Sequence, residues 1–236
     1  MFDSIAGDYD ALNHILSLDV DKIWRRRALK QIVDAPAPAQ VLDLACGTGD
    51  FSIAIAKTLK RSHKPVAEPN EATGGHVTGV DLSEGMLAVM RKKVDKAGLN
   101  EMISIEEGDG ENLRFLDNTF DRVTIAFGIR NFEDRPKGLK EMLRVLKPGG
   151  RLVILELSRP ENKFIRWFYD LYFLHILPKI GGKVSGDKAA YSYLPTSVAV
   201  FPGKKEFMTM MREAGFRTVT HKAFTLGICR MYTGEK

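Results

Sequence analysis

The stretch Val41–Ser52, VLDLACGTGDFS, decides the fold of this chain. It opens with a short apolar run, continues through Gly47 and Gly49, and leads into an amphipathic segment over about 50–59. An apolar strand that turns through glycine into a helix is the typical first unit of an open α/β sheet. The sequence therefore predicts an α/β fold whose first strand spans residues 41–45.

The rest of the chain alternates short apolar runs with longer amphipathic stretches, which favours a mostly parallel sheet. Ser83 is placed to cap one helix and Gly98 to end it. Residues 1–35 predict two short helices, and the polar segment 61–76, rich in glycine and proline, predicts a surface loop. The other expected elements are strands at 76–81, 102–106, 122–127 and 151–157, helices at about 83–96, 134–145 and 204–214, and a terminal hairpin of 217–223 and 227–232.

Composition excludes several classes of protein. The chain has 236 residues, 44% hydrophobic and 28% charged, which excludes a collagen-like or wholly disordered chain. Its two cysteines, Cys46 and Cys229, are too few for a disulfide scaffold. No uncharged apolar run reaches the roughly 20 residues that a spanning helix needs, and no secretory signal opens the chain. We therefore expect a cytoplasmic protein.

Basic charge is concentrated in the C-terminal third of the chain. The net charge is +5, and residues 160–236 hold 12 lysines and arginines against 6 aspartates and glutamates. One interpretation is a solvated basic surface, and the other is a face that rests on anionic lipid or holds an acidic ligand. Nucleic acid is not expected as a partner, because the basic residues are not interleaved with a stacking-aromatic motif.

The glycine turn points to a particular class of cofactor. It resembles the dinucleotide fingerprint G-x-G-x-x-G, but Ser52 stands in the place of the third glycine, which weakens the NAD interpretation. Asp43, four residues before Gly47, instead gives the D-x-x-x-G-x-G pattern of S-adenosylmethionine sites. That cofactor carries no phosphate, so glycine backbone, a hydroxyl such as Thr48, and carboxylates suit it.

Acidic residues also follow the next two predicted strands. Asp81 is expected to accept hydrogen bonds from the ribose hydroxyls, and Asp109 to reach the adenine amino group, with Gly110 leaving room for the ring. Asp81 follows Gly49 by 32 residues rather than the usual 20 or so, and the loop 61–76 accounts for the excess. Because ligands of open α/β sheets bind at the carboxyl ends of the strands, the pattern favours a ligand site over a plain strand–helix connection.

Three further segments carry a resemblance to a known family. Residues 6–24, AGDYDALNHILSLDVDKIW, and residues 144–158, RVLKPGGRLVILELS, resemble the two signatures of the ubiquinone/menaquinone biosynthesis C-methyltransferases. Between them, FGIRN at 127–131 resembles that family's F-G-x-R-N segment. The resemblance covers nearly the whole chain, with Cys46 a departure where many relatives carry glycine.

The resemblance implies a fold and an activity. The fold is that of a class I S-adenosylmethionine-dependent methyltransferase, Rossmann-like, with a mostly parallel seven-stranded sheet whose last strand is antiparallel. The implied activity is methylation of the ring carbon of demethylmenaquinol or of the ubiquinone precursor. We expect a single domain built from an N-terminal helical lid (1–35), a cofactor-binding core (36–159), a helical cap insertion (160–203), and a C-terminal helix and hairpin (204–236).

The expected cofactor site combines the motif residues with their neighbours. It comprises Asp43, Gly47, Thr48, Gly49, Asp81, Leu82, Met86, Asp109, Gly110 and Ala126. No metal is expected, since His63 and His76 lack partner ligands at suitable spacing and fit solvated loop residues better.

Ring C-methylation requires a ring carbon made nucleophilic by deprotonation of a neighbouring hydroxyl. Arg130 is expected to stabilise the phenolate and Asn131 to orient the ring oxygen, although a surface ion pair is the alternative role for Arg130. Arginine cannot readily act as a base, so a bound water or a nearby carboxylate would take the proton. Tyr9 and Asn13 share a helix face and, with Tyr193, are expected at the acceptor site; packing is the alternative for the first two.

The aromatic stretch Phe164–Ile180 has two interpretations. It is either a buried helix of the cap, or it partly lines the access route for a prenyl tail and meets the bilayer surface. The second interpretation implies a prenylated quinol as substrate and a peripheral position at the inner face of the membrane. A homodimer, a methyltransferase acting on another small apolar acceptor, and a non-catalytic binding protein are left open.

Overall fold

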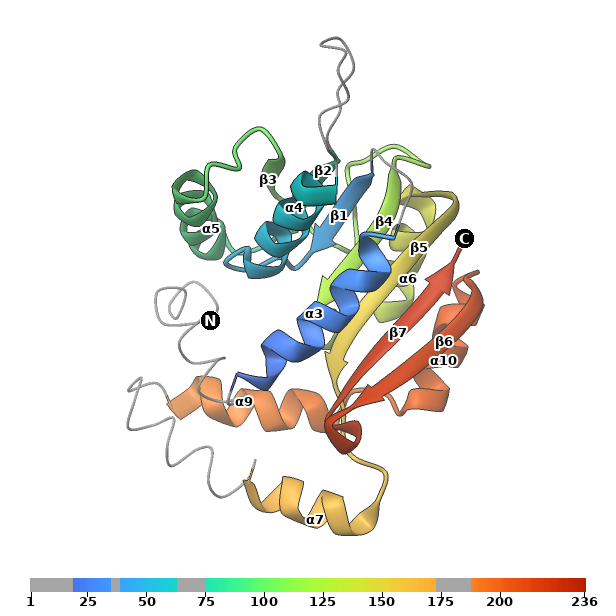
Figure 1. The fold of residues 1–236 in the computed structure, drawn as a ribbon. Coiled ribbons are helices and arrows are strands. Elements are labelled where there is room, and N and C mark those ends of the chain that lie inside the picture. The colour runs from blue at the N-terminus through green and yellow to red at the C-terminus, as the bar shows by residue number, and fades with distance from the viewer. Residues whose placement is uncertain (1–18, 35–38, 63–74, 173–187) are drawn as a thin grey trace.

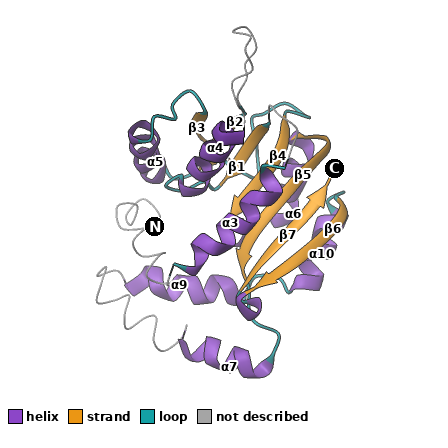
Figure 2. Ribbon diagram, in the orientation of Figure 1, coloured by secondary structure: helices purple, strands orange, loops and turns teal. Residues whose placement is uncertain are grey.

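The computed structural model describes residues 19–34, 39–62, 75–172 and 188–236, which form a seven-stranded sheet with helices on both faces (Figures 1 and 2). The strand order is β3-β2-β1-β4-β5-β7-β6. The first five strands are parallel, and β7 is antiparallel to both of its neighbours, β5 and β6. This confirms the predicted sheet.

The element bounds agree closely with the sequence prediction. The strands are β1 (Gln40–Leu44), β2 (His76–Asp81), β3 (Ile103–Glu107), β4 (Phe120–Ala126), β5 (Leu146–Leu157), β6 (Arg217–Phe224) and β7 (Cys229–Glu235). The helices are α3 (Val20–Ile32), α4 (Asp50–Ser62), α5 (Glu84–Lys96), α6 (Arg135–Val145), α7 (Lys163–Leu171), α9 (Lys188–Ala199) and α10 (Lys204–Glu213), with short 3-10 turns η1 (Ile129–Asn131) and η3 (Thr225–Gly227).

Two predicted signals act as expected at α5. The hydroxyl oxygen of Ser83 accepts a hydrogen bond from the Met86 N–H at 3.2 Å, which caps the first turn. Gly98 follows the helix in the left-handed region, at φ +61°. The largest difference is at β5, which begins at Leu146 rather than at 151, because Leu146 pairs with Phe120 across a register shift in β4.

The sheet separates two apolar cores. On one face, α3, α4 and α5 pack against strand residues such as Val41 and Val77. On the other, α6 and α10 pack against residues such as Leu42 and Leu44. Side chains of consecutive strand residues point to opposite faces, so both cores take residues from the same strands. The sheet is therefore buried on both sides, as an open α/β sheet requires.

Several expectations fall wholly or partly outside the described residues. The first of the two N-terminal helices, most of the loop 61–76, and residues 173–180 of the aromatic stretch are not described. In the part of the chain that is described, no helix is both long and apolar enough to span a membrane.

His76 does not behave as a loop residue. It begins β2, and its Nε2 lies in a hydrogen bond with the hydroxyl of Ser104, at 2.8 Å. Across the described residues, no group of three histidine, cysteine, aspartate or glutamate side chains is placed to hold a metal ion.

Candidate functional site

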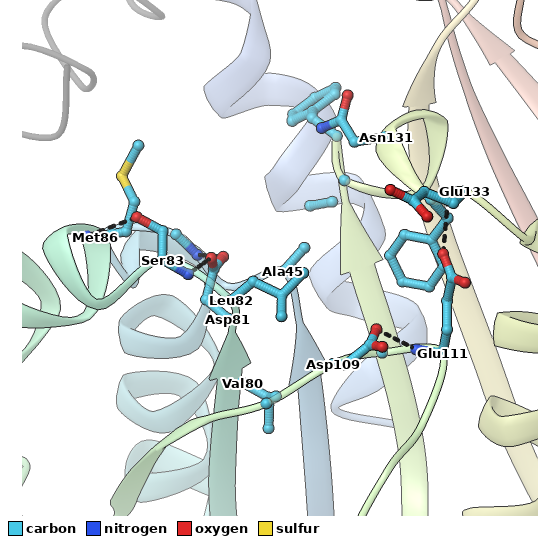
Figure 3. Close-up of a pocket in the computed structure, with 17 residues that line it drawn as sticks. Ala45, Val80, Asp81, Leu82, Ser83, Met86, Asp109, Glu111, Asn131 and Glu133 are labelled. Carbon is cyan, nitrogen blue, oxygen red and sulfur yellow. Dashed lines mark hydrogen bonds between the residues drawn. The ribbon is translucent and has the colours of Figure 1, made fainter. Parts of the chain in front are cut away.

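A cavity of about 460 Å³ opens at the carboxyl ends of β1, β2 and β4. From β1 the chain continues outward to β2 and β3 and then crosses back to β4 on the other side of β1, so the strand order reverses here, which is where open α/β sheets bind ligands. The residues that line the cavity are Ala45, Gly47, Val80, Asp81, Leu82, Ser83, Met86, Gly108, Asp109, Gly110, Glu111, Ala126, Phe127, Gly128, Asn131, Phe132 and Glu133 (Figure 3). Of the residues predicted at the site, those that line it are Gly47, Asp81, Leu82, Met86, Asp109, Gly110, Ala126 and Asn131.

The carboxylate of Asp81 joins two turns beside the cavity. Its Oδ2 accepts a hydrogen bond from the Gly47 N–H at 2.8 Å, and its Oδ1 accepts one from the Ser83 N–H at 2.9 Å. These backbone donors fix the carboxylate at the end of β2, where the sequence predicts it. A carboxylate can accept about four hydrogen bonds. The geometry is therefore compatible with ribose hydroxyls as donors in addition to these two backbone N–H groups.

The glycine turn is shaped by its backbone rather than by its side chains. Gly47 and Gly49 have φ of +56° and +82°, and a Cβ on Gly49 would lie 2.4 Å from Cγ of Met90. Thr48 is buried, and its hydroxyl accepts a hydrogen bond from Lys93 Nζ at 3.2 Å. Thr48 and Gly49 do not line the cavity, so the expected direct contact of the Thr48 hydroxyl with the cofactor is not seen.

Asp43 also lies away from the cavity, contrary to expectation. Its carboxylate is buried beneath the turn and accepts a hydrogen bond from the Ser52 hydroxyl at 2.5 Å, which ties β1 to α4. Burial raises the pKa of Asp43 to about 7, although the hydrogen bond from Ser52 and the charge of Arg25 both oppose the rise. Asp43 therefore supports the turn from below.

Acidic residues after β3 form a chain of hydrogen bonds along one wall of the cavity. Asp109 Oδ1 accepts from the Glu111 N–H at 2.8 Å, and Glu111 Oε1 accepts from the Glu133 N–H at 2.7 Å. A Cβ on Gly110 would lie 2.5 Å from Cζ of Phe132. Gly110 therefore leaves room for the Phe132 ring, and the adenine approach expected from the sequence stays a prediction.

Arg130 is placed differently from the sequence prediction. Its guanidinium is buried, pairs with Glu156 Oε1 at 2.8 Å, and donates to the Phe127 carbonyl and to the Ser197 hydroxyl. Arg130 does not line the cavity, so the expected direct stabilisation of a phenolate is not supported by this geometry. The ion-pair alternative is correct, but the pair is buried rather than at the surface.

Asn131 lines the cavity and contacts a second predicted residue. The hydroxyl of Tyr193, in α9, donates to Asn131 Oδ1 at 2.9 Å. Figure 3 shows the Asn131 side chain at the rim, on the opposite side of the cavity from Ser83 and Met86. The structure thus brings Asn131 and Tyr193 together, whereas Tyr9 and Asn13 lie outside the described residues.

Sequence reasoning missed the residues that directly follow β1 and β4. Ala45 and Phe127 line the cavity with positive φ, +48° and +62°, although neither is glycine. A Cβ on Gly128 would lie 2.5 Å from the Cβ of Ala45, so the two strand ends approach closely. Strained backbone of this kind often occurs at ligand sites. The strand-end rule that identified Asp81 would also have identified Phe127 and Gly128.

Comparison with known proteins adds an independent observation. The profile of the ubiE/COQ5 methyltransferase family matches residues 1–236. The chain is 44% identical to the demethylmenaquinone methyltransferase of Bacteroides fragilis and 48% identical to the ubiquinone/menaquinone biosynthesis C-methyltransferase UbiE of Geobacter sulfurreducens. Both alignments cover 100% of this chain, and they cover 91% and 87% of the two relatives. The chain belongs to the ubiE/COQ5 methyltransferase family.

Solved structures agree with this membership at the level of the fold. An S-adenosylmethionine-dependent methyltransferase of Thermotoga maritima matches with a TM-score of 0.65 at 20% identity, covering 100% of this chain and 98% of its own. One of Aquifex aeolicus matches with a TM-score of 0.59 at 20% identity, covering 89% and 88%. These likenesses show that the protein has the fold of the class I methyltransferases, as the sequence predicted.

The methyl donor of this ubiE/COQ5 family member is S-adenosylmethionine, and the lining of the cavity fits it. The charged side chains among the described lining residues are all acidic: Asp81, Asp109, Glu111 and Glu133. Carboxylates accept hydrogen bonds from hydroxyl and amino groups and complement the positive sulfonium and ammonium of the donor. The same lining would repel a pyrophosphate, which argues against a dinucleotide.

Proposed function

We propose that this protein transfers a methyl group from S-adenosylmethionine to a ring carbon of a prenylated quinol, with demethylmenaquinol as the substrate. The observation that carries the proposal is the full-length similarity, at 44%, to a relative named demethylmenaquinone methyltransferase. The UbiE relative of Geobacter sulfurreducens, at 48% identity, supports the ubiquinone precursor as a second acceptor.

Asn131 is the residue best placed to contact the acceptor. Because Tyr193 donates to its Oδ1, the amide nitrogen Nδ2 is left to point away from that bond, and no described residue accepts from it. An N–H donor at a developing oxyanion stabilises negative charge on oxygen, and it does so more strongly in a site that excludes water. Asn131 would thus favour the ionised ring hydroxyl that makes the neighbouring carbon nucleophilic.

Arg130 would act as a positioning residue for Asn131. Glu156 binds both its guanidinium, at 2.8 Å, and its backbone N–H, at 3.2 Å, while the Arg130 side chain also holds Ser197 of α9 at 3.3 Å. These bonds fix the turn η1, which carries Asn131, against the helix that carries Tyr193. The buried ion pair therefore holds both partners of the Tyr193–Asn131 contact in place.

The bound donor supplies an activated methyl group on its sulfonium. Asp81 and Asp109 would hold its nucleoside, and Asn131 would orient the acceptor. Transfer breaks the carbon–sulfur bond, forms the carbon–carbon bond at the ring, and leaves the ring proton to be lost to solvent or to a cavity carboxylate. The acidic cavity wall offers such a carboxylate in Glu133, two residues after Asn131.

We also propose that helix α7 contacts the membrane surface from which a prenylated substrate would be drawn. Phe164, Trp167 and Phe168 are 71%, 60% and 51% exposed, and the Phe168 ring contacts the other two edge to face, with ring centroids 5.0 and 4.8 Å apart. Tyr169 faces inward and packs on Val198. The segment that carries this aromatic surface has the excess of basic residues noted above, which suits anionic lipid.

The test of the proposed reaction is an assay with labelled S-adenosylmethionine and short-chain demethylmenaquinol. We expect a product one methyl group heavier by mass spectrometry, with the label on the ring carbon. A parallel assay with the ubiquinone precursor decides whether both acceptors are used. Label on oxygen or nitrogen, or no transfer to either quinol despite donor binding, would contradict the proposal and favour a different apolar acceptor.

A further inference from the structure

Arg25, on α3, is a charged residue beside the cavity that the proposed reaction does not use. Its guanidinium carbon lies 5.3 Å from the centroid of the Phe127 ring, and Phe127 lines the cavity. Trp24 approaches the same ring at 6.2 Å. Figure 1 shows that the N-terminal part of α3 lies at the carboxyl edge of the sheet, and the contact with Phe127 places Arg25 at this edge, beside the ligand site.

The hydrogen-bonding groups of Arg25 are only partly used. Its Nε lies 3.4 Å from Asp21 Oδ2, and neither Nη atom donates to a described residue. Other cations near this edge are engaged: Lys93 pairs with Asp50, and Arg130 pairs with Glu156. The side chain of Arg25 is 21% exposed, so its forked donors are shielded from bulk solvent yet reachable.

The charges of the methyl donor call for such a group. The donor carries a sulfonium, an ammonium and a carboxylate, and the charged side chains of the described cavity wall are all acidic. The first two charges are complemented by this wall, whereas the carboxylate is repelled by it. A partly shielded guanidinium with unused Nη donors is the side chain best suited to a carboxylate, because it can donate two parallel hydrogen bonds.

Asp43 gives a second indication of where the charge of Arg25 acts. This carboxyl lies directly beneath the glycine turn, and Arg25 lowers its pKa by electrostatic attraction, although burial has the larger and opposite effect. The positive charge is therefore felt at the turn between β1 and α4, on the α3 side of the sheet. Asp81 lies at the end of β2, on the other side of β1 from Phe127, which follows β4.

We infer that Arg25 binds the carboxylate of the amino-acid tail of S-adenosylmethionine. The inference rests on the proposed function only for the identity of the donor. Asp81 would then hold the ribose at the β2 end of the cavity and Arg25 the tail at the Phe127 end, so the donor would span the strand ends between them. The stacking of Arg25 on Phe127 fixes the guanidinium before the donor arrives.

The test compares two ligands by calorimetry: S-adenosylhomocysteine and its decarboxylated analogue, which keeps the amine and lacks the carboxylate. The wild-type protein is expected to prefer the first ligand by about ten- to a hundredfold, the value of a charge-assisted hydrogen bond. Arg25→Met should abolish this preference by weakening S-adenosylhomocysteine alone, and Arg25→Lys should retain most of it. The matched control is Lys22→Met, on the same helix and exposed, which should change neither affinity.

Three results would overturn the inference. One is equal affinity of the wild-type protein for the two ligands, which requires no variant and so stands even where Arg25→Met fails to fold. The second is an unchanged preference in Arg25→Met. The third is an equal loss of affinity for both ligands in Arg25→Met, which would show that Arg25 has only a structural role. If the ligand preference is as expected but no quinol is methylated, the proposed acceptor is wrong and the inference stands.

Discussion

Tyr193 donates its hydroxyl to Asn131 Oδ1 at 2.9 Å, joining helix α9 to the turn that follows β4. This single bond decides which face of the Asn131 amide the cavity presents, because the oxygen is occupied and the nitrogen is not. Removing the hydroxyl would let the amide rotate, and an oxygen turned toward the acceptor would oppose the ionised ring hydroxyl.

We therefore expect Tyr193→Phe to lower kcat about tenfold or more, the scale of one misaligned hydrogen bond at a developing charge. The affinity for S-adenosylhomocysteine should stay within twofold, since Tyr193 does not line the cavity. Steady-state kinetics together with calorimetry measure both. The matched control is Tyr232→Phe, which removes a buried hydroxyl that has no hydrogen-bond partner among the described residues. Unchanged kcat in Tyr193→Phe would contradict the role given to Asn131.

Asp81→Ala should weaken donor binding by roughly 2–4 kcal/mol, the value of hydrogen bonds to a charged group together with the loss of support for Gly47 and Ser83. Calorimetry with S-adenosylhomocysteine measures the change. Asp95→Ala, which removes an exposed carboxylate of α5 that accepts a hydrogen bond from Asn100, serves as the control and should bind normally. Wild-type affinity in Asp81→Ala would remove Asp81 from the donor site.

Glu156→Ala should destabilise the fold by about 3–5 kcal/mol, because it leaves the Arg130 guanidinium buried without its carboxylate. Urea unfolding measures the free energy. Glu84→Ala is the matched control: its carboxylate is 58% exposed and pairs with Arg91, which is also exposed, so at most about 1 kcal/mol should be lost. A similar small loss in both variants would show that the Arg130–Glu156 pair does not hold the turn.

Asp43 makes the stability of the fold depend on pH. Its pKa is about 7 in the folded protein against an ordinary 3.8, so between these values the folded state binds the proton that the unfolded state releases. The contribution of Asp43 to stability is therefore lost as pH rises from about 4 to about 7. At pH 8 the loss is on the order of 4 kcal/mol.

Asp43→Asn should remove this dependence and unfold at a higher urea concentration than the wild type at pH 8, with a smaller difference at pH 5. The free energy of unfolding at the two pH values, for variant and wild type, provides the measurement. Stability differences that are equal at both pH values would show that the buried carboxyl of Asp43 is not responsible.

Helix α7 should govern attachment to lipid. We expect the wild-type protein to float with vesicles that contain anionic phosphatidylglycerol at low salt, and the Trp167→Ala, Phe168→Ala double variant to lose most of this flotation. Leu116→Ala, which removes a side chain that is 82% exposed elsewhere on the surface, should float like the wild type. Negligible flotation of the wild type, or equal flotation of all three proteins, would count against the membrane proposal.

The sequence predicts the framework of the fold well because its signals are local. Apolar runs mark the strands, Ser83 caps α5, and Gly98 ends it. The alternation of side chains along β1 also holds information that the prediction did not use. Since Leu42 and Leu44 face the core under α6, Asp43 must face the opposite core, where it meets Ser52 of α4.

The environment of Arg130 could not be predicted in the same way. Its partner Glu156 lies 26 residues away, and the two meet because Ala126 pairs with Leu155 in the parallel register of β4 and β5. That register depends on the shift near Phe120, which no local pattern reveals. The contact between Tyr193 and Asn131 likewise depends on where α9 packs. Such tertiary placement decides which of two adjacent residues, Arg130 or Asn131, reaches the cavity.

The central claim is that the cavity at the ends of β1, β2 and β4 binds the methyl donor. A crystal structure of the wild-type protein with S-adenosylhomocysteine tests it most directly. We predict the nucleoside in this cavity, with the ribose hydroxyls within hydrogen-bond distance of the Asp81 carboxylate. A nucleoside bound elsewhere on the protein, or a ribose that makes no contact with Asp81, would contradict the account.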